Sequence, residues 1–187
     1  TEIYTLSLHD ALPICQSLAE RTLFDPNSII SRCVELVKHQ SLFHNIDMVL
    51  QLDAHLPQIL GDPSQLHQVF TNLLLNAVDA MDGRGCITIT SQPASSGDSV
   101  ILTFADTGTG IPAHVRDKIF DPFFTTKPPG KGTGLGLAIV YGVIQRHGGS
   151  IEVACPPDGG TAFIMTLPLH APEDTQFFEV LSPKCRG

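Results

Sequence analysis

Three polar side chains lie at helical spacing in the run N-L-L-L-N-A-V-D-A. Asn72, Asn76 and Asp79 fall at positions i, i+4 and i+7, so one face of a helix presents all three. Amide and carboxylate oxygens are hard ligands that suit Mg²⁺, which is usually bound together with substrate phosphates. An exposed polar stripe on an amphipathic helix explains the same pattern, so the run alone only favours a metal–phosphate site.

A second run, D-T-G-T-G-I at residues 106–111, comes directly after a predicted strand. Asp106 opens this run, and a carboxylate at a strand end can accept a hydrogen bond from an exocyclic amine. Gly108 and Gly110 allow the backbone to approach a ligand closely. A tight Asp-Gly turn without a ligand is the alternative interpretation.

The run I-F-D-P-F-F-T-T-K, residues 119–127, places three phenylalanines beside a segment rich in glycine and proline. These rings could anchor a movable segment over a pocket. Ordinary core packing of at least one ring is the alternative.

The run G-K-G-T-G-L-G-L, residues 130–137, leads into a predicted helix. Glycine-rich backbone at a helix N-terminus directs N–H groups at a phosphate, and the helix dipole favours negative charge there. Lys131 and Lys127 add positive charge. The run is not a Walker loop, because G-x-x-x-x-G-K-[ST] does not occur, and no strand precedes it as a dinucleotide-binding fingerprint requires.

Together and in this order, the four runs resemble the N, first glycine, F and second glycine boxes of histidine kinase catalytic domains. These domains belong to a wider superfamily with DNA gyrase, Hsp90 and MutL. The resemblance covers about residues 25–169 and is close to the nitrogen-regulation type of sensor kinase, in which N-A-x-D-A-M and D-P-F-F-T-T-K are typical. It implies a Bergerat ATP-binding fold that binds ATP and Mg²⁺.

The resemblance also implies roles for individual residues. Asn76 is expected to bind Mg²⁺ that bridges the ATP phosphates, with Asn72 nearby, and Asp106 is expected to hydrogen-bond the adenine amine. The residues expected to form the ATP site are Asn72, Asn76, Asp79, Asp106, Gly108, Gly110, Ile111, Phe120, Lys127, Lys131, Gly132, Thr133, Gly134, Leu135, Gly136 and Thr161.

The implied reaction transfers the γ-phosphoryl group of ATP to a histidine on a dimerisation hairpin, and then to the receiver domain of a response regulator. ATP-hydrolysing members of the superfamily carry a glutamate four residues before the Mg²⁺-binding asparagine; Asn72 stands there instead and cannot act as that base. An anti-sigma-type serine kinase, a protein-dehydrogenase kinase and a non-catalytic binding module remain the alternatives. The F-D-P-F-F-T-T-K run argues against the kinase alternatives, and the intact Asn76 and Asp106 argue against the binding module.

The first fourteen residues resemble the translation of a sequencing adapter, so we exclude them from fold reasoning. His9 lies within these residues and is therefore not a candidate phosphoacceptor, although its surroundings, H-D-A-L-P, resemble the box around a phosphoaccepting histidine. We therefore expect residues 15–24 to be a remnant of the histidine hairpin, residues 25–169 to be the catalytic domain and residues 170–187 to be a tail or linker. Without the hairpin, the chain is expected to be monomeric and unable to autophosphorylate.

Hydrophobic periodicity predicts the elements that position these residues. The expected helices open at 25–27 and reach Val37, run from 63 to about 81, and span 135–147. The expected strands cover 46–52, 86–91, 99–105, 150–154 and 161–167. This order predicts an α/β (α+β) two-layer sandwich, with a mixed sheet of about five strands and three main helices on one face.

The composition excludes some classes of partner and indicates the cellular compartment. The formal net charge of −8 argues against nonspecific nucleic-acid binding, and no apolar run approaches the length of a membrane span. The five cysteines include no C-x-x-C pair, which favours reduced thiols in the cytoplasm over a disulfide framework or a zinc site. No secretory signal is apparent.

Overall fold

The computed structural model describes residues 21–128, 132–156 and 159–170. The expectations for residues 1–14, for Lys131 and for residues 171–187 lie outside these ranges. The expected hairpin remnant at 15–24 is described only from Arg21 onwards.

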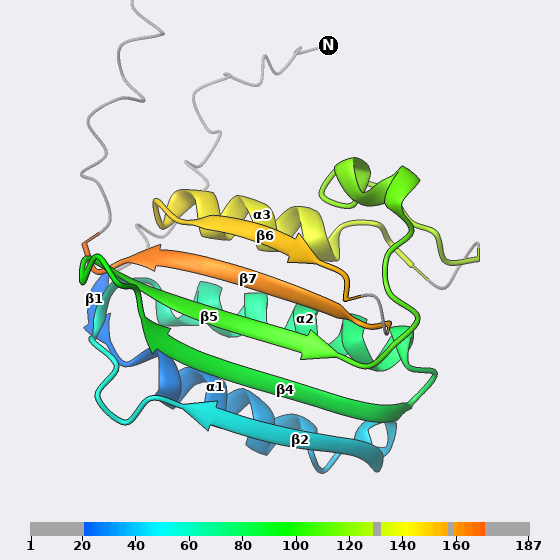
Figure 1. The fold of residues 1–187 in the computed structure, drawn as a ribbon, viewed down its shortest axis with the longest axis horizontal. Coiled ribbons are helices and arrows are strands. Elements are labelled where there is room, and N and C mark those ends of the chain that lie inside the picture. The colour runs from blue at the N-terminus through cyan, green and yellow to red at the C-terminus, as the bar shows by residue number, and fades with distance from the viewer. Residues whose placement is uncertain (1–20, 129–131, 157–158, 171–187) are drawn as a thin grey trace, which may run out of the picture.

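A five-stranded mixed sheet forms one layer of the fold (Figure 1). Its strands lie side by side in the order β2-β4-β5-β7-β6. β2 pairs with β4 in parallel, and the other three pairs are antiparallel. The strands are β2 (Asn45–Leu52), β4 (Arg84–Pro93), β5 (Ser99–Asp106), β6 (Ser150–Ala154) and β7 (Thr161–Pro168).

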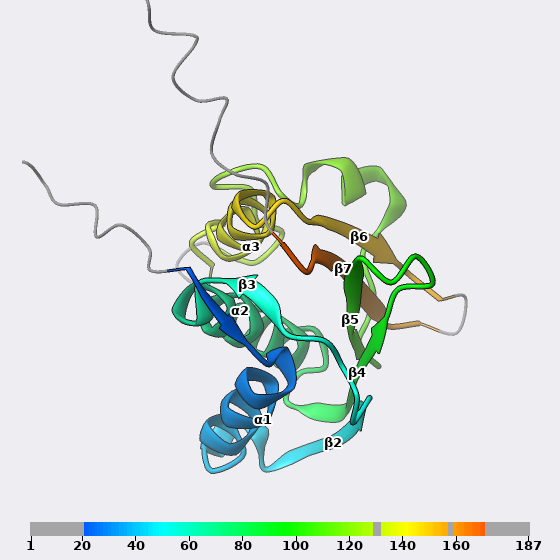
Figure 2. The same cartoon turned by 90° about the vertical axis from the view of Figure 1, so that its left-hand side faces the viewer.

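Three α-helices form the second layer and cover one face of this sheet, as the side view in Figure 2 shows. They are α1 (Pro26–Val37), α2 (Pro63–Ala80) and α3 (Gly136–Arg146). The predicted two-layer sandwich with a mixed five-stranded sheet is therefore confirmed. Each of these eight elements begins and ends within two residues of its predicted limits. None of the helices in the described ranges combines the length and the apolar run needed to cross a membrane.

Helices α1 and α2 both begin with an Asp-Pro pair that fixes where they start. The Asp25 side chain accepts the N–H of Asn27 at 2.9 Å. Asp62 accepts the N–H groups of Ser64 and Gln65 at 2.8 and 3.3 Å. The following proline has no N–H to leave unpaired, so the pair suits the first helical position.

The apolar face of α2 packs against the sheet and supplies much of the core. The rings of Phe70 on α2 and Phe104 on β5 stack with their centroids 5.2 Å apart. The buried residues of α2 are Leu66, Val69, Phe70, Leu73, Leu74, Ala77 and Val78. Because this face is committed to the core, the residues on the other face of α2 have a fixed direction.

Two short strands are not predicted by the sequence. β1 (Thr22–Phe24) and β3 (Ile59–Gly61) form a separate antiparallel pair. Three residues are too few for a periodic signal, which explains why both strands escape sequence analysis. Residues 22–24 lie within the expected hairpin remnant, yet here they pair with β3, which lies within residues 25–169.

Two further features concern an edge strand and the connections. β2 is an edge strand of the sheet, and its Leu50 side chain is 40% exposed. Two short 3-10 helices, η2 (Ser41–Phe43) and η3 (Ala113–Lys118), lie in segments without periodicity.

His147 joins the end of α3 to the start of α2. Its Nδ1 lies 2.8 Å from the Val143 carbonyl oxygen, and the Asp62 backbone N–H donates to its Nε2 at 3.0 Å. An accepting Nε2 places the proton on Nδ1, so the buried ring is neutral. Burial lowers the pKa of His147 below its ordinary value of 6.5, against the upward influence of Val143 and Asp62.

We expect the free energy of unfolding to decrease as the pH falls below 6.5, because the unfolded His147 side chain takes up a proton before the folded one does. The stability that the neutral His147 side chain contributes is fully present above pH 6.5. It is lost as the pH falls toward the lower pKa of His147 in the folded state. Urea unfolding from about pH 7.5 to about pH 5.5, where carboxylates of ordinary pKa stay ionised, measures the effect. His147→Leu should cost about 1–3 kcal/mol at the upper pH and flatten the dependence.

His55→Leu is the matched control, because the His55 side chain is 97% exposed. It should keep both the stability and the pH dependence of the unmodified chain. A pH dependence that persists unchanged in His147→Leu would contradict this account of His147.

Candidate functional site

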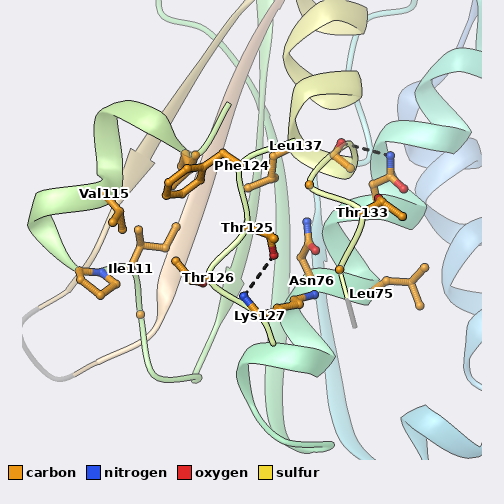
Figure 3. Close-up of a pocket in the computed structure, with 17 residues that line it drawn as sticks. Leu75, Asn76, Ile111, Val115, Phe124, Thr125, Thr126, Lys127, Thr133 and Leu137 are labelled. Carbon is orange, nitrogen blue, oxygen red and sulfur yellow. Dashed lines mark hydrogen bonds between the residues drawn. The ribbon is translucent and has the colours of Figure 1, made fainter. Parts of the chain in front are cut away.

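A cavity of about 390 Å³ lies between α2, the start of α3 and the segment that connects β5 to α3 (Figure 3). Its lining comes from each of the four runs that the sequence analysis selected. The lining residues are Asn72, Leu75, Asn76, Gly110, Ile111, Pro112, Val115, Ile119, Phe124, Thr125, Thr126, Lys127, Gly132, Thr133, Gly134, Gly136 and Leu137.

The two ends of this cavity differ in chemistry. Figure 3 shows Ile111, Val115 and Phe124 together at one end. Asn76 and Lys127 lie toward the other end. Apolar side chains can hold a flat ring, whereas amide and ammonium groups can hold phosphate oxygens. Among the described lining residues, Lys127 is the only one with a charged side chain.

Nine of the predicted ATP-site residues line this cavity. They are Asn72, Asn76, Gly110, Ile111, Lys127, Gly132, Thr133, Gly134 and Gly136. Six other predicted residues are described but lie outside the lining: Asp79, Asp106, Gly108, Phe120, Leu135 and Thr161.

Sequence reasoning did not select the remaining lining residues, which are Leu75, Pro112, Val115, Ile119, Phe124, Thr125, Thr126 and Leu137. The F-D-P-F-F-T-T-K run contained a usable signal for Phe124 to Thr126, since these residues stand between Phe120 and Lys127. The others are mostly ordinary core residue types, which carry no signal of a ligand.

Backbone amides hold the Asp106 carboxylate at the end of β5. Its Oδ1 accepts the N–H of Gly108 at 2.8 Å and the N–H of Thr161 at 3.3 Å. Burial raises the pKa of Asp106, and these two hydrogen bonds lower it. Within the described ranges Oδ2 has no hydrogen bond, so it remains a free acceptor.

A turn at Gly160 packs against the backbone around Asp106 and Gly108. The Gly160 N–H donates to the Gly108 carbonyl at 2.8 Å. The Gly160 carbonyl oxygen would lie 3.0 Å from a Cβ on Gly110. Asp106 and Thr161 therefore belong to a packed contact beside the cavity, whereas Gly110 reaches the cavity itself. Asp106 is not among the residues that line the cavity with Asn76, and its expected contact with adenine stays a prediction.

A backbone clamp joins the phenylalanine run to the second glycine run. The Phe123 N–H donates to the Gly134 carbonyl at 2.9 Å, and both residues have positive φ, 66° and 67°. A Cβ on Gly134 would lie 2.4 Å from the Phe123 carbonyl carbon, so only glycine fits. The Phe123 side chain is 75% exposed, while the adjacent Phe124 lines the cavity.

The start of α3 lies against the polar face of α2. Asn72 donates from Nδ2 to the Gly136 carbonyl at 3.3 Å. The Nδ2 of Asn76 would lie 3.9 Å from a Cβ on Gly136. Leu135 cannot cap α3 with its side chain, so N–H groups of the first turn and the positive end of the helix dipole remain available there.

Lys127 is fixed at both its backbone and its ammonium group. Its N–H donates to the Thr125 hydroxyl at 3.1 Å (Figure 3), and its Nζ forms an ion pair with the Asp79 carboxylate. The chain passes closely at Gly132, where a Cβ would lie 2.7 Å from the Thr125 hydroxyl oxygen. Among the described residues of the cavity lining, Asp79 forms this ion pair with Lys127.

Phe120 packs against α3 and does not line the cavity. Its ring centroid lies 5.4 Å from that of Tyr141, with the two rings tilted. The alternative of ordinary packing therefore describes Phe120, whereas Phe124 lines the cavity.

Asn76 fits a magnesium site by donor type, since its amide oxygen is a hard ligand. Within the described ranges, no group of three His, Cys, Asp or Glu residues is arranged to bind a metal. A Mg²⁺ ion at Asn76 would therefore depend on phosphate oxygens of a ligand and on water for its other ligands.

Comparison with known proteins identifies similar sequences. The profile of the family described as "Histidine kinase-, DNA gyrase B-, and HSP90-like ATPase" matches residues 61–171. Sensor histidine kinase ZraS of Escherichia coli (strain K12) is 39% identical over 146 residues, which are 78% of this chain and 30% of ZraS. The chain thus spans less than a third of this relative.

Solved structures share the fold. The catalytic domain of histidine kinase ThkA matches with a TM-score of 0.73 and 34% identity, over 81% of this chain and 97% of that domain. ThkA in complex with the response regulator protein TrrA matches with a TM-score of 0.67 and 31% identity, over 80% and 42% of the two chains. Full-length ShkA in complex with AMPPNP matches with a TM-score of 0.70 and 29% identity, over 81% and 32%.

We expect Gly134→Ala to weaken ATP binding, because the new Cβ must displace Phe123 and with it the cavity wall from Phe124 to Lys127. Overpacking of about 1–3 kcal/mol corresponds to about a 5- to 150-fold loss of affinity if the nucleotide needs this wall. Titration calorimetry with ATP and Mg²⁺ measures the loss.

Gly83→Ala is a matched control for backbone strain. Gly83 has a φ of 74°, but nothing lies within 4 Å of its added Cβ. This variant should lose about 1 kcal/mol of stability and keep its affinity for ATP. Equal affinities in Gly134→Ala and Gly83→Ala would show that the clamp does not shape the site.

Proposed function

The chain belongs to the histidine kinase-, DNA gyrase B- and HSP90-like ATPase family, and we propose that it is the catalytic domain of a sensor histidine kinase. In this proposal it binds ATP with Mg²⁺ and transfers the γ-phosphoryl group to a histidine of another domain. The main support is one cavity with an apolar end, and with Asn76, Lys127 and the start of α3 at its polar end.

The apolar end suits the base, and the strand end beside it supplies a specific contact. Ile111 and Val115 offer apolar surface for an adenine ring. The free Oδ2 of Asp106 can accept a hydrogen bond from the exocyclic amine, provided that the base reaches past Gly110. An ionised carboxylate is acceptor-only, so it selects an amine over a carbonyl at this position.

The polar end suits the phosphates. Backbone at Gly132 and Gly134 lines the cavity without side chains, and the first turn of α3 presents N–H groups near Asn76. Bound Mg²⁺ would neutralise charge on the phosphate oxygens. The protein contributes positioning and preorganised positive charge, which is most of what phosphoryl transfer requires.

Phosphoryl transfer to a protein is favoured over ATP hydrolysis by the residue four positions before Asn76. Asn72 stands there, and its Nδ2 is bonded to the Gly136 carbonyl. An amide held in this way cannot accept a proton from water as a general base. The acceptor must therefore bring its own nucleophile, and a neutral histidine nitrogen does so.

The proposed partners follow from the same reaction. The acceptor histidine belongs to a dimerisation and phosphotransfer hairpin of the same protein, and the phosphoryl group then passes to the receiver domain of a response regulator. The ThkA–TrrA complex supports such a pairing for a relative. The proposal places the domain in the cytoplasm, where ATP is available.

The domain boundary is also a proposal. We place its start at Thr22 rather than at Asp25, because β1 pairs with β3 directly before α2. Its end stays at Leu169, whose N–H donates to the Asp98 carbonyl at 2.9 Å.

Mixing the chain with [γ-³²P]ATP, Mg²⁺ and a separately purified histidine hairpin tests the reaction. We expect label on the hairpin that is stable in alkali and lost in acid, because phosphohistidine is acid-labile. The hairpin with its histidine replaced by glutamine is the control and should stay unlabelled. Acid-stable label would instead identify a serine or threonine kinase.

We expect Asp106→Asn to weaken ATP binding about 100-fold, equivalent to about 2.7 kcal/mol, with little change in melting temperature. The asparagine carbonyl can replace Oδ1 as acceptor for the amides of Gly108 and Thr161. Its NH₂ group then stands where Oδ2 stood and faces the adenine amine, donor against donor. Calorimetry and thermal unfolding of the same samples measure the two quantities.

Inosine triphosphate sharpens this test, since its base carries a carbonyl where adenine carries the amine. Asp106→Asn should lose less affinity for inosine triphosphate than for ATP, so that the preference for ATP falls. An unchanged ATP affinity would refute the adenine contact.

A further inference from the structure

Lys127 separates two hollows of the surface. On one side it lines the main cavity with Asn76 and Gly134. On the other side it lines a second hollow together with Asp79 and Asp82. Its side chain is 35% exposed, so the ammonium group can reach solvent and a ligand.

Asp79 draws the Lys127 ammonium toward the second hollow. The two groups form an ion pair, although Asp79 itself does not line the main cavity. The Asp79 side chain is 54% exposed. Exposed pairs of this kind contribute only about 0.2–1 kcal/mol, so a stronger anion can take the lysine away.

A triphosphate would supply such an anion at this place. If the base occupies the end with Ile111 and Val115, the terminal phosphate lies farthest from it, toward Asn76 and Lys127 (Figure 3). A γ-phosphate carries more charge than one carboxylate and has several acceptor oxygens. A diphosphate ends one group earlier and leaves Lys127 with Asp79.

We propose that Lys127 recognises the γ-phosphate, and that Asp79 holds its ammonium aside whenever that phosphate is absent. The pair thereby discriminates ATP from ADP. Binding of ATP exchanges the Lys127–Asp79 ion pair for a Lys127–phosphate contact, whereas binding of ADP leaves the ion pair intact. Asp79 acts through Lys127 and does not touch the nucleotide. This inference rests on the proposed function, since it needs a nucleotide in the cavity.

Calorimetric titration with ATP and with ADP, each with Mg²⁺, tests the exchange in four chains: unmodified, Lys127→Met, Asp79→Asn and the double variant. Lys127→Met should lower ATP affinity about tenfold and ADP affinity less than about twofold. Asp79→Asn should raise ATP affinity by about two- to fivefold, because the competing carboxylate is gone, and leave ADP affinity within about twofold.

The double variant separates competition for Lys127 from simple repulsion. In the Lys127→Met background, Asp79→Asn should bring no gain in ATP affinity. A gain that persists there would mean that Asp79 repels the nucleotide directly, and it would overturn the inference. A loss of ATP affinity in Asp79→Asn, or an equal loss of ATP and ADP in Lys127→Met, would overturn it as well.

Asp82→Asn is the matched charge control. Asp82 lines the same second hollow as Asp79, and its φ of 51° suits asparagine equally well. This variant should leave the ratio of ATP to ADP affinity unchanged, and a change as large as that of Asp79→Asn would count against a specific role of the pair. An unmodified chain that binds neither nucleotide would refute the proposed function itself, which keeps the two failures distinct.

Discussion

The rest of the structure depends on helix α2, because one of its faces packs in the hydrophobic core and the other lines the cavity. Its apolar face is buried against the sheet, and the stacked rings of Phe70 and Phe104 fix its rotation about its own axis. A helix that cannot rotate presents Asn72, Asn76 and Asp79 in fixed directions, and no loop could do so with the same precision. The hydrophobic core therefore sets the geometry of the polar site, although the two share no residue of α2.

The opposite wall of the cavity is built on backbone rather than on side chains. Phe123 and Gly134 are joined by a main-chain hydrogen bond, and the close approach of the Phe123 backbone leaves no room for a Cβ on Gly134. Gly160 donates a comparable main-chain hydrogen bond to the Gly108 carbonyl. Close approach of two chains without side chains explains why glycine runs occur at these places in the sequence. It also explains how segments distant in sequence reach one cavity.

Hydrophobic periodicity was sufficient for the five strands of the main sheet, the three α-helices and the polar face of α2, because each spans several repeats of its pattern. The strand pair β1–β3 could not be predicted, since three residues carry no periodicity. The contact between Asp79 and Lys127 joins residues 48 positions apart and depends on the path of an irregular segment. The sequence predicted His147 only as the last residue of a helix. Its two hydrogen bonds depend on the packing of α2 against α3. Asp106 ends β5 as predicted, whereas its hydrogen bond from Thr161, 55 positions away, depends on the pairing of β5 with β7.

The amide at position 72 connects the architecture to the proposed chemistry. Asn72 donates a hydrogen bond to the Gly136 carbonyl and so ties the first turn of α3 to α2. An ionised carboxylate has no proton to donate, and at this position it would face the carbonyl oxygen acceptor against acceptor. The contact that holds α3 against Asn76 thus requires a hydrogen-bond donor at position 72, which an ionised glutamate is not. The same side chain thus holds the start of α3 and occupies the position four residues before Asn76, so a glutamate placed there would have to change the start of α3 as well.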